Sequence, residues 1–209
     1  MITSVVHSFQ ERLQFSLDMS SEGDWVSFYR RLWPDAISIV RVDKDSVQQR
    51  SGIDRIVILP NGKQITIDEK IREKDYGDIL LEEWTVADYD WKNKKLIRGR
   101  KIGWTLDPSK TCDFISYAVL SSGVCFLLPY ELLRMATAFN LASWKESPDC
   151  KYPVPVANEG YTTINIAVPW TILKDQITRQ MHRTFAREKI ELPQPKLIGN
   201  QLTFEWIQK

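Results

Sequence analysis

Residues 51–78, SGIDRIVILPNGKQITIDEKIREKDYGD, contain two short apolar runs on either side of the turn-forming sequence Pro60-Asn61-Gly62. Turn residues between two such runs predict a β-hairpin. The charges at the ends of the runs are unusual, because Asp54 opens the first strand and Asp68-Glu69-Lys70 lies at the far end of the second. A charge beside the core of a sheet must be paired or must hold a metal. The hairpin is therefore the first place to look for a functional site.

The length of the turn decides which charges share a face, since side chains alternate along a strand and a one-residue shift inverts the pattern. A two-residue Asn61-Gly62 turn of type I′ sets Asp54 opposite Glu69 and points Lys70 away. This register stays open at this point, because Asn-Gly is a strong signal for that turn.

We prefer a three-residue loop, Pro60-Asn61-Gly62, because proline favours the second position of a type I turn and glycine supplies the positive φ. This loop sets Asp54 opposite Asp68, and Lys70 then points the same way as Asp68. Two carboxylates suit Mg²⁺, a hard cation that keeps several waters and bridges to phosphate oxygens. A neighbouring lysine can orient the attacking water or stabilise the charge of the transition state.

Asp54, a hairpin and Asp68-Glu69-Lys70 together resemble the PD-(D/E)XK nuclease superfamily. The resemblance covers residues 50–72, and the order of predicted strands is compatible with it as far as residue 145. It implies a restriction-endonuclease-like fold and the cleavage of DNA or RNA phosphodiesters with Mg²⁺ or Mn²⁺. By this resemblance Asp54 and Asp68 hold the metal, Lys70 assists the attacking water, and Glu69 is an extra ligand.

The chain departs from the family pattern at one position, because Ile53 and not proline precedes Asp54. A literal Pro34-Asp35 lies upstream, where it follows a predicted helix and indicates a helix stop. The family often uses a further acid from the first helices or from beside the triplet. The more distant acids of this chain are predicted as solvated surface residues, and they are Glu11, Glu22, Glu82 and Glu83.

A basic stretch at residues 92–101 follows the third strand of this region, with Trp91 before it and Trp104 after it. Its basic residues are Lys92, Lys94, Lys95, Arg98, Arg100 and Lys101. A flexible basic loop with flanking aromatic residues can track a phosphate backbone and stack on unpaired bases. The alternative is a solvated loop that Asp88 and Asp90 neutralise, and it stays open.

The remaining periodicity predicts a mixed α/β (α+β) fold, with a central mixed β-sheet flanked by helices. Helices are expected at 5–18, 24–33, 130–144 and 170–189. Strands are expected at 36–42, 54–59, 63–72, 78–85, 113–120, 123–129 and 161–169, and the tail can add a final strand. The proline-rich segment 147–160 is the best internal break. We therefore expect a nuclease-like core over residues 1–145 and a C-terminal extension over residues 146–209, packed on the same domain.

Composition restricts the functional class further. The net charge of +1 means that nucleic-acid binding requires a local patch of charge. The cysteines (Cys112, Cys125 and Cys150) are widely spaced without a CxxC pair, which argues against a disulfide framework or zinc site. His7 and His182 lie far apart, which argues against a histidine-based catalytic triad.

No signal peptide or membrane span is predicted. We expect a cytoplasmic protein whose partner is nucleic acid, DNA rather than RNA, with no membrane partner; a homodimer stays open. The alternative function is a non-catalytic, nuclease-like module of bacterial or phage origin that binds DNA or a protein partner.

Overall fold

The computed structural model describes residues 22–44, 46–188, 195–198 and 201–204. The helix predicted over residues 5–18 lies outside them, and so does Glu11. The described elements are, in chain order, α2 (Glu22–Leu32), β1 (Ser38–Arg41), α3 (Val47–Arg50), β2 (Arg55–Ile58), β3 (Gln64–Arg72), β4 (Asp78–Asp90), β5 (Lys95–Ile102), β6 (Phe114–Val119), β7 (Val124–Pro129), α4 (Tyr130–Glu146), β8 (Lys151–Asn158), β9 (Tyr161–Pro169), α5 (Trp170–Glu188), β10 (Pro195–Ile198) and β11 (Gln201–Phe204).

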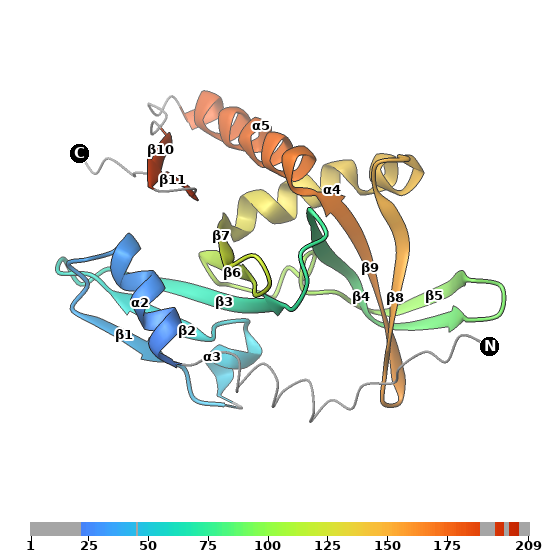
Figure 1. Cartoon of the computed structure of the whole chain (residues 1–209), viewed down its shortest axis with the longest axis horizontal. Helices are drawn as coiled ribbons and strands as arrows, with labels where there is room; N and C mark the ends of the chain where they lie inside the picture. Colours follow the sequence, from blue (N-terminus) through green and yellow to red (C-terminus); the bar gives the residue numbers. More distant parts are fainter. Residues whose placement is uncertain (1–21, 45, 189–194, 199–200, 205–209) are drawn as a thin grey trace.

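Two larger sheets and flanking helices make up the fold (Figure 1). The first sheet has five strands in the order β1-β2-β3-β6-β7, and it is mixed because β3 and β6 run parallel while its other pairs are antiparallel. The second has four antiparallel strands in the order β5-β4-β9-β8. A small hairpin of β10 and β11 follows near the end of the chain. The predicted mixed α+β class is confirmed, but the structure has two larger sheets where one central mixed sheet was expected.

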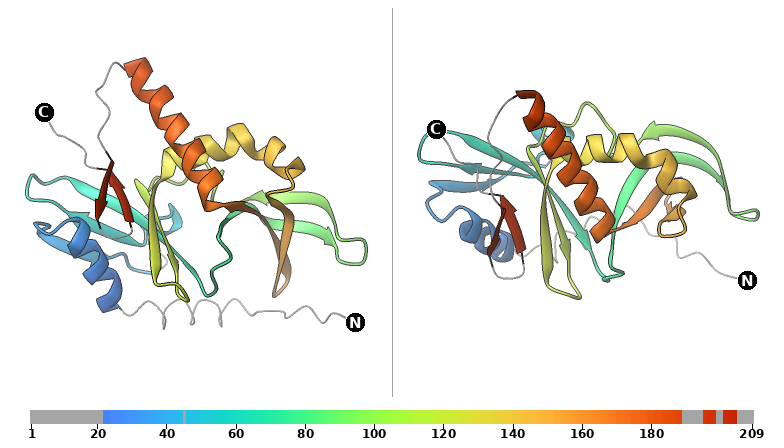
Figure 2. Two further views of the ribbon diagram at one scale, coloured as in Figure 1. Left: turned by 45° about the horizontal axis from the view of Figure 1, so that its top comes forward. Right: turned by 90° about the horizontal axis from the view of Figure 1, so that it is seen from above.

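The helices bury the two faces of the five-stranded sheet in separate cores. Helix α2 places Trp25, Phe28 and Tyr29 against Val57 and Ile67 of the β2–β3 hairpin. On the other face, α4 and α5 lie side by side, as Figure 2 shows, and pack against β4, β6, β7 and β9. Side chains alternate along β3, so Ile65 and Ile67 join the core under α2, while Asp68 and Lys70 lie on the other face.

The β2–β3 hairpin has the predicted three-residue loop. The Leu59 amide donates to the Lys63 carbonyl at 2.9 Å, and the Gly62 amide donates to the Leu59 carbonyl at 2.9 Å. Gly62 has φ of +80°, a value that only glycine adopts without strain. The strands pair from Ile58 with Gln64 to Arg55 with Ile67, and the next residues in this register are Asp54 and Asp68. The preferred register is therefore confirmed, and the two-residue turn is excluded.

The predicted basic loop is wrong as a description of the backbone. β4 does not end at residue 85 but continues to Asp90, and residues 95–102 form its partner strand β5. Only residues 91–94 form the turn between them. β5 is an edge strand that is exposed along most of its length, so it lacks the alternation of apolar residues that identifies a half-buried strand.

The proline-rich segment 147–160 also contains a strand that the sequence did not predict. β8 is the other edge of the four-stranded sheet, where proline is tolerated because its missing N–H leaves no central pairing unmet. Its neighbour β9 pairs with β4, so strands from residues 1–145 and 146–209 share this sheet. Within the described residues, no helix has the length and apolar character needed to cross a membrane.

Candidate active site

Asp54 and Asp68 lie opposite each other at the open end of the β2–β3 hairpin, on the face away from α2. Asp54 directly precedes β2, and its Oδ2 accepts a hydrogen bond of 2.9 Å from the backbone amide of Glu69. Asp68 is only 2% exposed. Burial raises the pKa of Asp68 to about 7; the charge of Lys70 opposes this rise, and the charge of Asp54 and a hydrogen bond to it add to it. The two acids therefore form a close pair that resists carrying two negative charges.

Lys70 completes this group from two residues further along β3. Its ammonium is paired with the Asp68 carboxylate and lies 5.5 Å from the centre of the Trp104 ring. Burial lowers the pKa of Lys70, but the charges of Asp68 and Asp54 outweigh burial and raise it to about 12. The lysine is thus a permanent cation, and its side chain keeps 28% of its surface exposed. Such a group can stabilise negative charge or orient a water, but it does not accept a proton near neutral pH.

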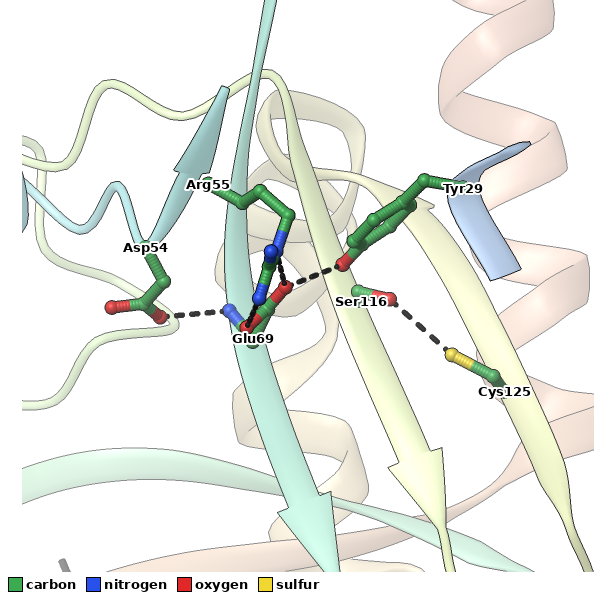
Figure 3. A network of polar contacts seen from close by, with 6 residues as sticks. All are labelled: Tyr29, Asp54, Arg55, Glu69, Ser116 and Cys125. Atoms are coloured by element: carbon green, nitrogen blue, oxygen red, sulfur yellow. Dashed lines mark hydrogen bonds and ion pairs between the residues drawn. The ribbon is translucent and has the colours of Figure 1, made fainter. Parts of the chain in front are cut away.

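Glu69 lies on the opposite face of β3 from Asp68 and Lys70, and Figure 3 shows its carboxylate beside Arg55 and Tyr29. Its Oε1 accepts hydrogen bonds from Arg55 Nε at 2.6 Å and from the Tyr29 hydroxyl at 3.0 Å. Burial raises the pKa of Glu69, while Arg55 opposes that rise. The expectation that Glu69 is an extra metal ligand does not fit this geometry, because its carboxylate faces α2 and is already held by a buried guanidinium. Glu69 instead links α2 to the sheet, through its contacts with Tyr29 and Arg55, on the face opposite Asp68.

The site lies where the two sheets meet, and the second sheet supplies neighbours that the sequence analysis did not identify. Glu82 of β4 is close enough to Lys70 for its charge to help raise the pKa of the lysine. Glu82 Oε1 accepts a 2.6 Å hydrogen bond from the Thr85 hydroxyl and a 3.3 Å bond from the Trp104 amide. Glu82 is therefore not the freely solvated residue that was predicted. No local sequence pattern indicates this contact, because it joins residues of two different sheets.

The segment between β5 and β6 passes beside the site and is fixed there by Tyr130. The Tyr130 hydroxyl lies 2.8 Å from the carbonyl oxygens of both Trp104 and Asp107. Cys112, at the end of this segment, is buried; burial raises the pKa of its thiol to about 12, and the charge of Asp68 adds to the rise. The Cys112 thiol therefore stays protonated and lines the site, and it does not act as a nucleophile.

Glu83, the next residue along β4, points away from Glu82 into the core beneath α4. It is 6% exposed, and its Oε1 accepts a 2.6 Å contact from Lys145 Nζ. The prediction that Glu83 is solvated is therefore wrong. It belongs to a partly buried ion pair that joins α4 to the four-stranded sheet, away from Asp54 and Asp68.

The predicted nucleic-acid-binding residues line an exposed strand rather than the acidic pair. They lie on β5 and the turn before it, at the far end of the molecule from β1 and β2 (Figure 1). Asp88 pairs with Arg100 at 2.8 Å, both side chains being more than a third exposed. Within the described part of the chain, Lys92, Lys94, Lys95 and Arg98 form no ion pair. The local neutralisation considered for this stretch thus applies to Arg100 alone.

Pro34-Asp35, the literal proline–aspartate sequence, forms an exposed turn after α2. It is the predicted helix stop and takes no part in the site.

Compared with known proteins, the chain matches no family model, and neither a curated protein nor a solved structure shows significant similarity to it.

Proposed function

We propose that this protein is a metal-dependent nuclease that hydrolyses phosphodiester bonds of nucleic acid, DNA rather than RNA. One observation carries the proposal: Asp54 and Asp68, from neighbouring strands, share a face of the sheet with Lys70, and Lys70 is paired with Asp68. A buried Asp68 beside a second acid and one lysine is costly to fold. A cation bound between the acids would offset this cost, because it neutralises their charges.

The donor set fits Mg²⁺ or Mn²⁺ better than it fits Zn²⁺. Two carboxylates are hard oxygen donors, and Mg²⁺ is commonly held by one or two carboxylates, with waters and phosphate oxygens completing its shell. Among the described residues, no cluster of three or more His, Cys, Asp or Glu side chains could hold a metal, so a fully protein-bound zinc site is not supported there. Asp54 and Asp68 are the residues that would hold Mg²⁺, and when bound it would activate a water and neutralise phosphate charge.

The protein's own groups have distinct tasks in this proposal. Asp68 must lose its proton to act as a ligand, and its raised pKa means that this proton is released close to neutral pH. Asp54 is oriented by the amide of Glu69, so its carboxylate is fixed before a ligand arrives. Lys70 donates hydrogen bonds from its ammonium and stabilises the extra negative charge of the phosphate under attack.

A restriction-endonuclease-like arrangement is the finer fold that we propose. It is supported by the mixed five-stranded sheet with α2 on one face and α4 on the other, and by the position of the acids on the central β2–β3 hairpin. The exposed lysines and arginines of β5 are proposed to contact the phosphate backbone.

Cleavage of a plasmid and of a labelled oligonucleotide, with Mg²⁺ or Mn²⁺ and with a chelator, tests the proposal. The variants are Asp54→Ala and Lys70→Ala, and the matched controls are Asp35→Asn and Lys74→Ala at exposed positions. We expect metal-dependent cleavage by the wild-type protein and both controls, and its loss in both site variants. Cleavage that survives in both site variants, or that is lost equally in the controls, would contradict the assignment.

A second candidate function is a nuclease-like module that binds DNA or a protein without cutting. One observation favours it: Lys70 already occupies the Asp68 carboxylate, so the charges can satisfy one another as a structural ion pair. This function predicts shifted bands without cleavage at any metal concentration. It also predicts that Asp54→Ala leaves nucleic-acid binding unchanged.

A further inference from the structure

An open groove of about 470 Å³ lies between the tip of the β4–β5 hairpin and the turn that joins β8 to β9. The first hairpin contributes Tyr89, Trp91 and Ile97 to its lining, and the second contributes Asn158 and Tyr161. The groove therefore belongs to the four-stranded sheet alone. It is separate from the acids of the β2–β3 hairpin.

Large apolar side chains are left exposed in this groove. Ile97 is 68% exposed and Trp91 is 43% exposed. The Tyr89 and Trp91 rings meet edge to face, with centroids 5.0 Å apart, so the indole is braced although much of its surface is open. A rigid, exposed aromatic ring beside an exposed aliphatic side chain is a surface on which a planar group can stack.

Basic residues lie beside the groove along β5 and the turn before it, while the only charged side chain in its described lining is Asp88. Six basic residues lie between residues 92 and 101, against the acids Asp88, Asp90 and Glu159. Two of the three acids are engaged locally: Asp88 pairs with Arg100, and the Asp90 carboxylate accepts hydrogen bonds from the turn amides of Lys92 and Asn93 and from the Asn93 side chain. The surface thus favours a polyanion that also carries flat apolar groups.

We propose that this groove binds the unpaired bases of a single-stranded nucleic acid, with a base stacked on Trp91 and the phosphates along the basic residues of β5. Single-stranded nucleic acid offers both features, because its bases are free to stack and its backbone is charged. Paired bases of a duplex do not expose their faces, so the groove discriminates against duplex. The inference deepens the proposed function and rests on it for the identification of the strand as part of the substrate.

The position of the groove on β4 indicates where such a strand lies relative to the cut. Glu82 lies beside Lys70, and Asp90 precedes Trp91 on the same strand. The step from Glu82 to Asp90 spans roughly 25 Å at about 3.3 Å per residue. This corresponds to about seven nucleotides at the duplex spacing of about 3.4 Å per strand. Bulges in β4 shorten this span, so it is an upper limit for the part of the strand that separates the groove from Lys70.

Fluorescence anisotropy with a labelled oligo(dT) strand and a labelled duplex tests the groove, in a chelator so that nothing is cut. Trp91→Ala is expected to weaken binding of oligo(dT) about tenfold or more, because base–aromatic stacking contributes that much per base. Binding of the duplex should change less than twofold. Trp91→Phe should retain most of the affinity. Ile97→Ala, at an exposed position and without a change of charge, should weaken oligo(dT) binding more than duplex binding.

The matched control is Tyr76→Ala, which removes an aromatic side chain that is 60% exposed outside the groove and should leave oligo(dT) binding unchanged. Unchanged oligo(dT) binding by Trp91→Ala would overturn the inference, and so would an equal loss of duplex binding in Trp91→Ala or Ile97→Ala. Displacement of oligo(dT) by poly-glutamate at equal concentration would also overturn it, because charge alone would then explain binding. Failure of the proposed function is separate, since it shows as the absence of metal-dependent cleavage by the wild-type protein.

Discussion

Replacing Asp68 with asparagine is expected to stabilise the protein increasingly as the pH rises. Asp68 is 2% exposed, and burial is the largest cause that raises its pKa from 3.8 to about 7. In the unfolded chain the carboxyl has an ordinary pKa of about 3.9. Between about pH 4 and pH 7 the folded protein therefore holds a proton that the unfolded chain has lost, so the free energy of unfolding falls through this window.

The size of the effect follows from the same values. Each pKa unit corresponds to about 1.4 kcal/mol, so a fully ionised Asp68 destabilises the fold by roughly 4 kcal/mol above pH 7. Asparagine carries no charge and removes this dependence. Lys70 loses its carboxylate partner in the variant but keeps the charges of Asp54 and Glu82 nearby. The gain over wild type should thus grow from near zero at pH 4 to several kcal/mol at pH 8.

Urea denaturation at a series of pH values, in the presence of a chelator, measures this difference by linear extrapolation. Asp35→Asn, at an exposed turn, is the control and should follow the wild-type curve. A difference between Asp68→Asn and wild type that stays constant from pH 4 to pH 8 would refute the argument. Asp68 would then titrate as an ordinary aspartate, and its burial beside Asp54 would not disfavour its ionised form.

Three other outcomes are expected. Mg²⁺ at a hundred times its Kd should raise the free energy of unfolding of the wild type by about 2.7 kcal/mol and that of Asp68→Asn by far less. Thermal or urea denaturation measures the difference. Equal effects in the two proteins would mean that the ion binds elsewhere. Glu69→Ala leaves the buried Arg55 guanidinium without its carboxylate, so it should lower the free energy of unfolding, measured in urea, by about 3–5 kcal/mol. Glu69→Gln is the control and should lower it less. In Gly99→Ala the new Cβ would lie 2.1 Å from the Trp84 ring, so a loss of about 1–3 kcal/mol and altered tryptophan fluorescence are expected; an unchanged spectrum and unfolding curve would contradict the close packing.

The sequence predicted the acid–lysine cluster because the hairpin register depends on local turn chemistry. Proline at the second turn position and glycine at positive φ select the three-residue loop, and the alternation of side chains along the strand then determines which residues share a face. Asp54, Asp68 and Lys70 could therefore be placed on one face before any tertiary contact was known. The same alternation puts Glu69 on the other face, so the preferred register itself left little reason to expect it as a ligand.

The parts that the sequence did not predict depend on contacts between distant segments. β5 and β8 are edge strands, and their exposure or prolines hide the usual alternation, so their sequences predict a loop and a break instead of strands. Glu83 looked like a solvated acid because its partner, Lys145, lies far away in the chain. Glu82 and Trp104 adjoin Lys70 only because the two sheets meet there, which no local pattern encodes.

The single-turnover rate at which the Mg²⁺-loaded protein cleaves a labelled oligonucleotide, compared between wild type and Lys70→Ala, tests the central claim most directly. If Lys70 stabilises the charge of the phosphate under attack, its removal should slow cleavage by about 10²- to 10³-fold while binding of the oligonucleotide changes little. Equal rates in the two proteins, or no Mg²⁺-dependent cleavage by the wild type, would contradict the account.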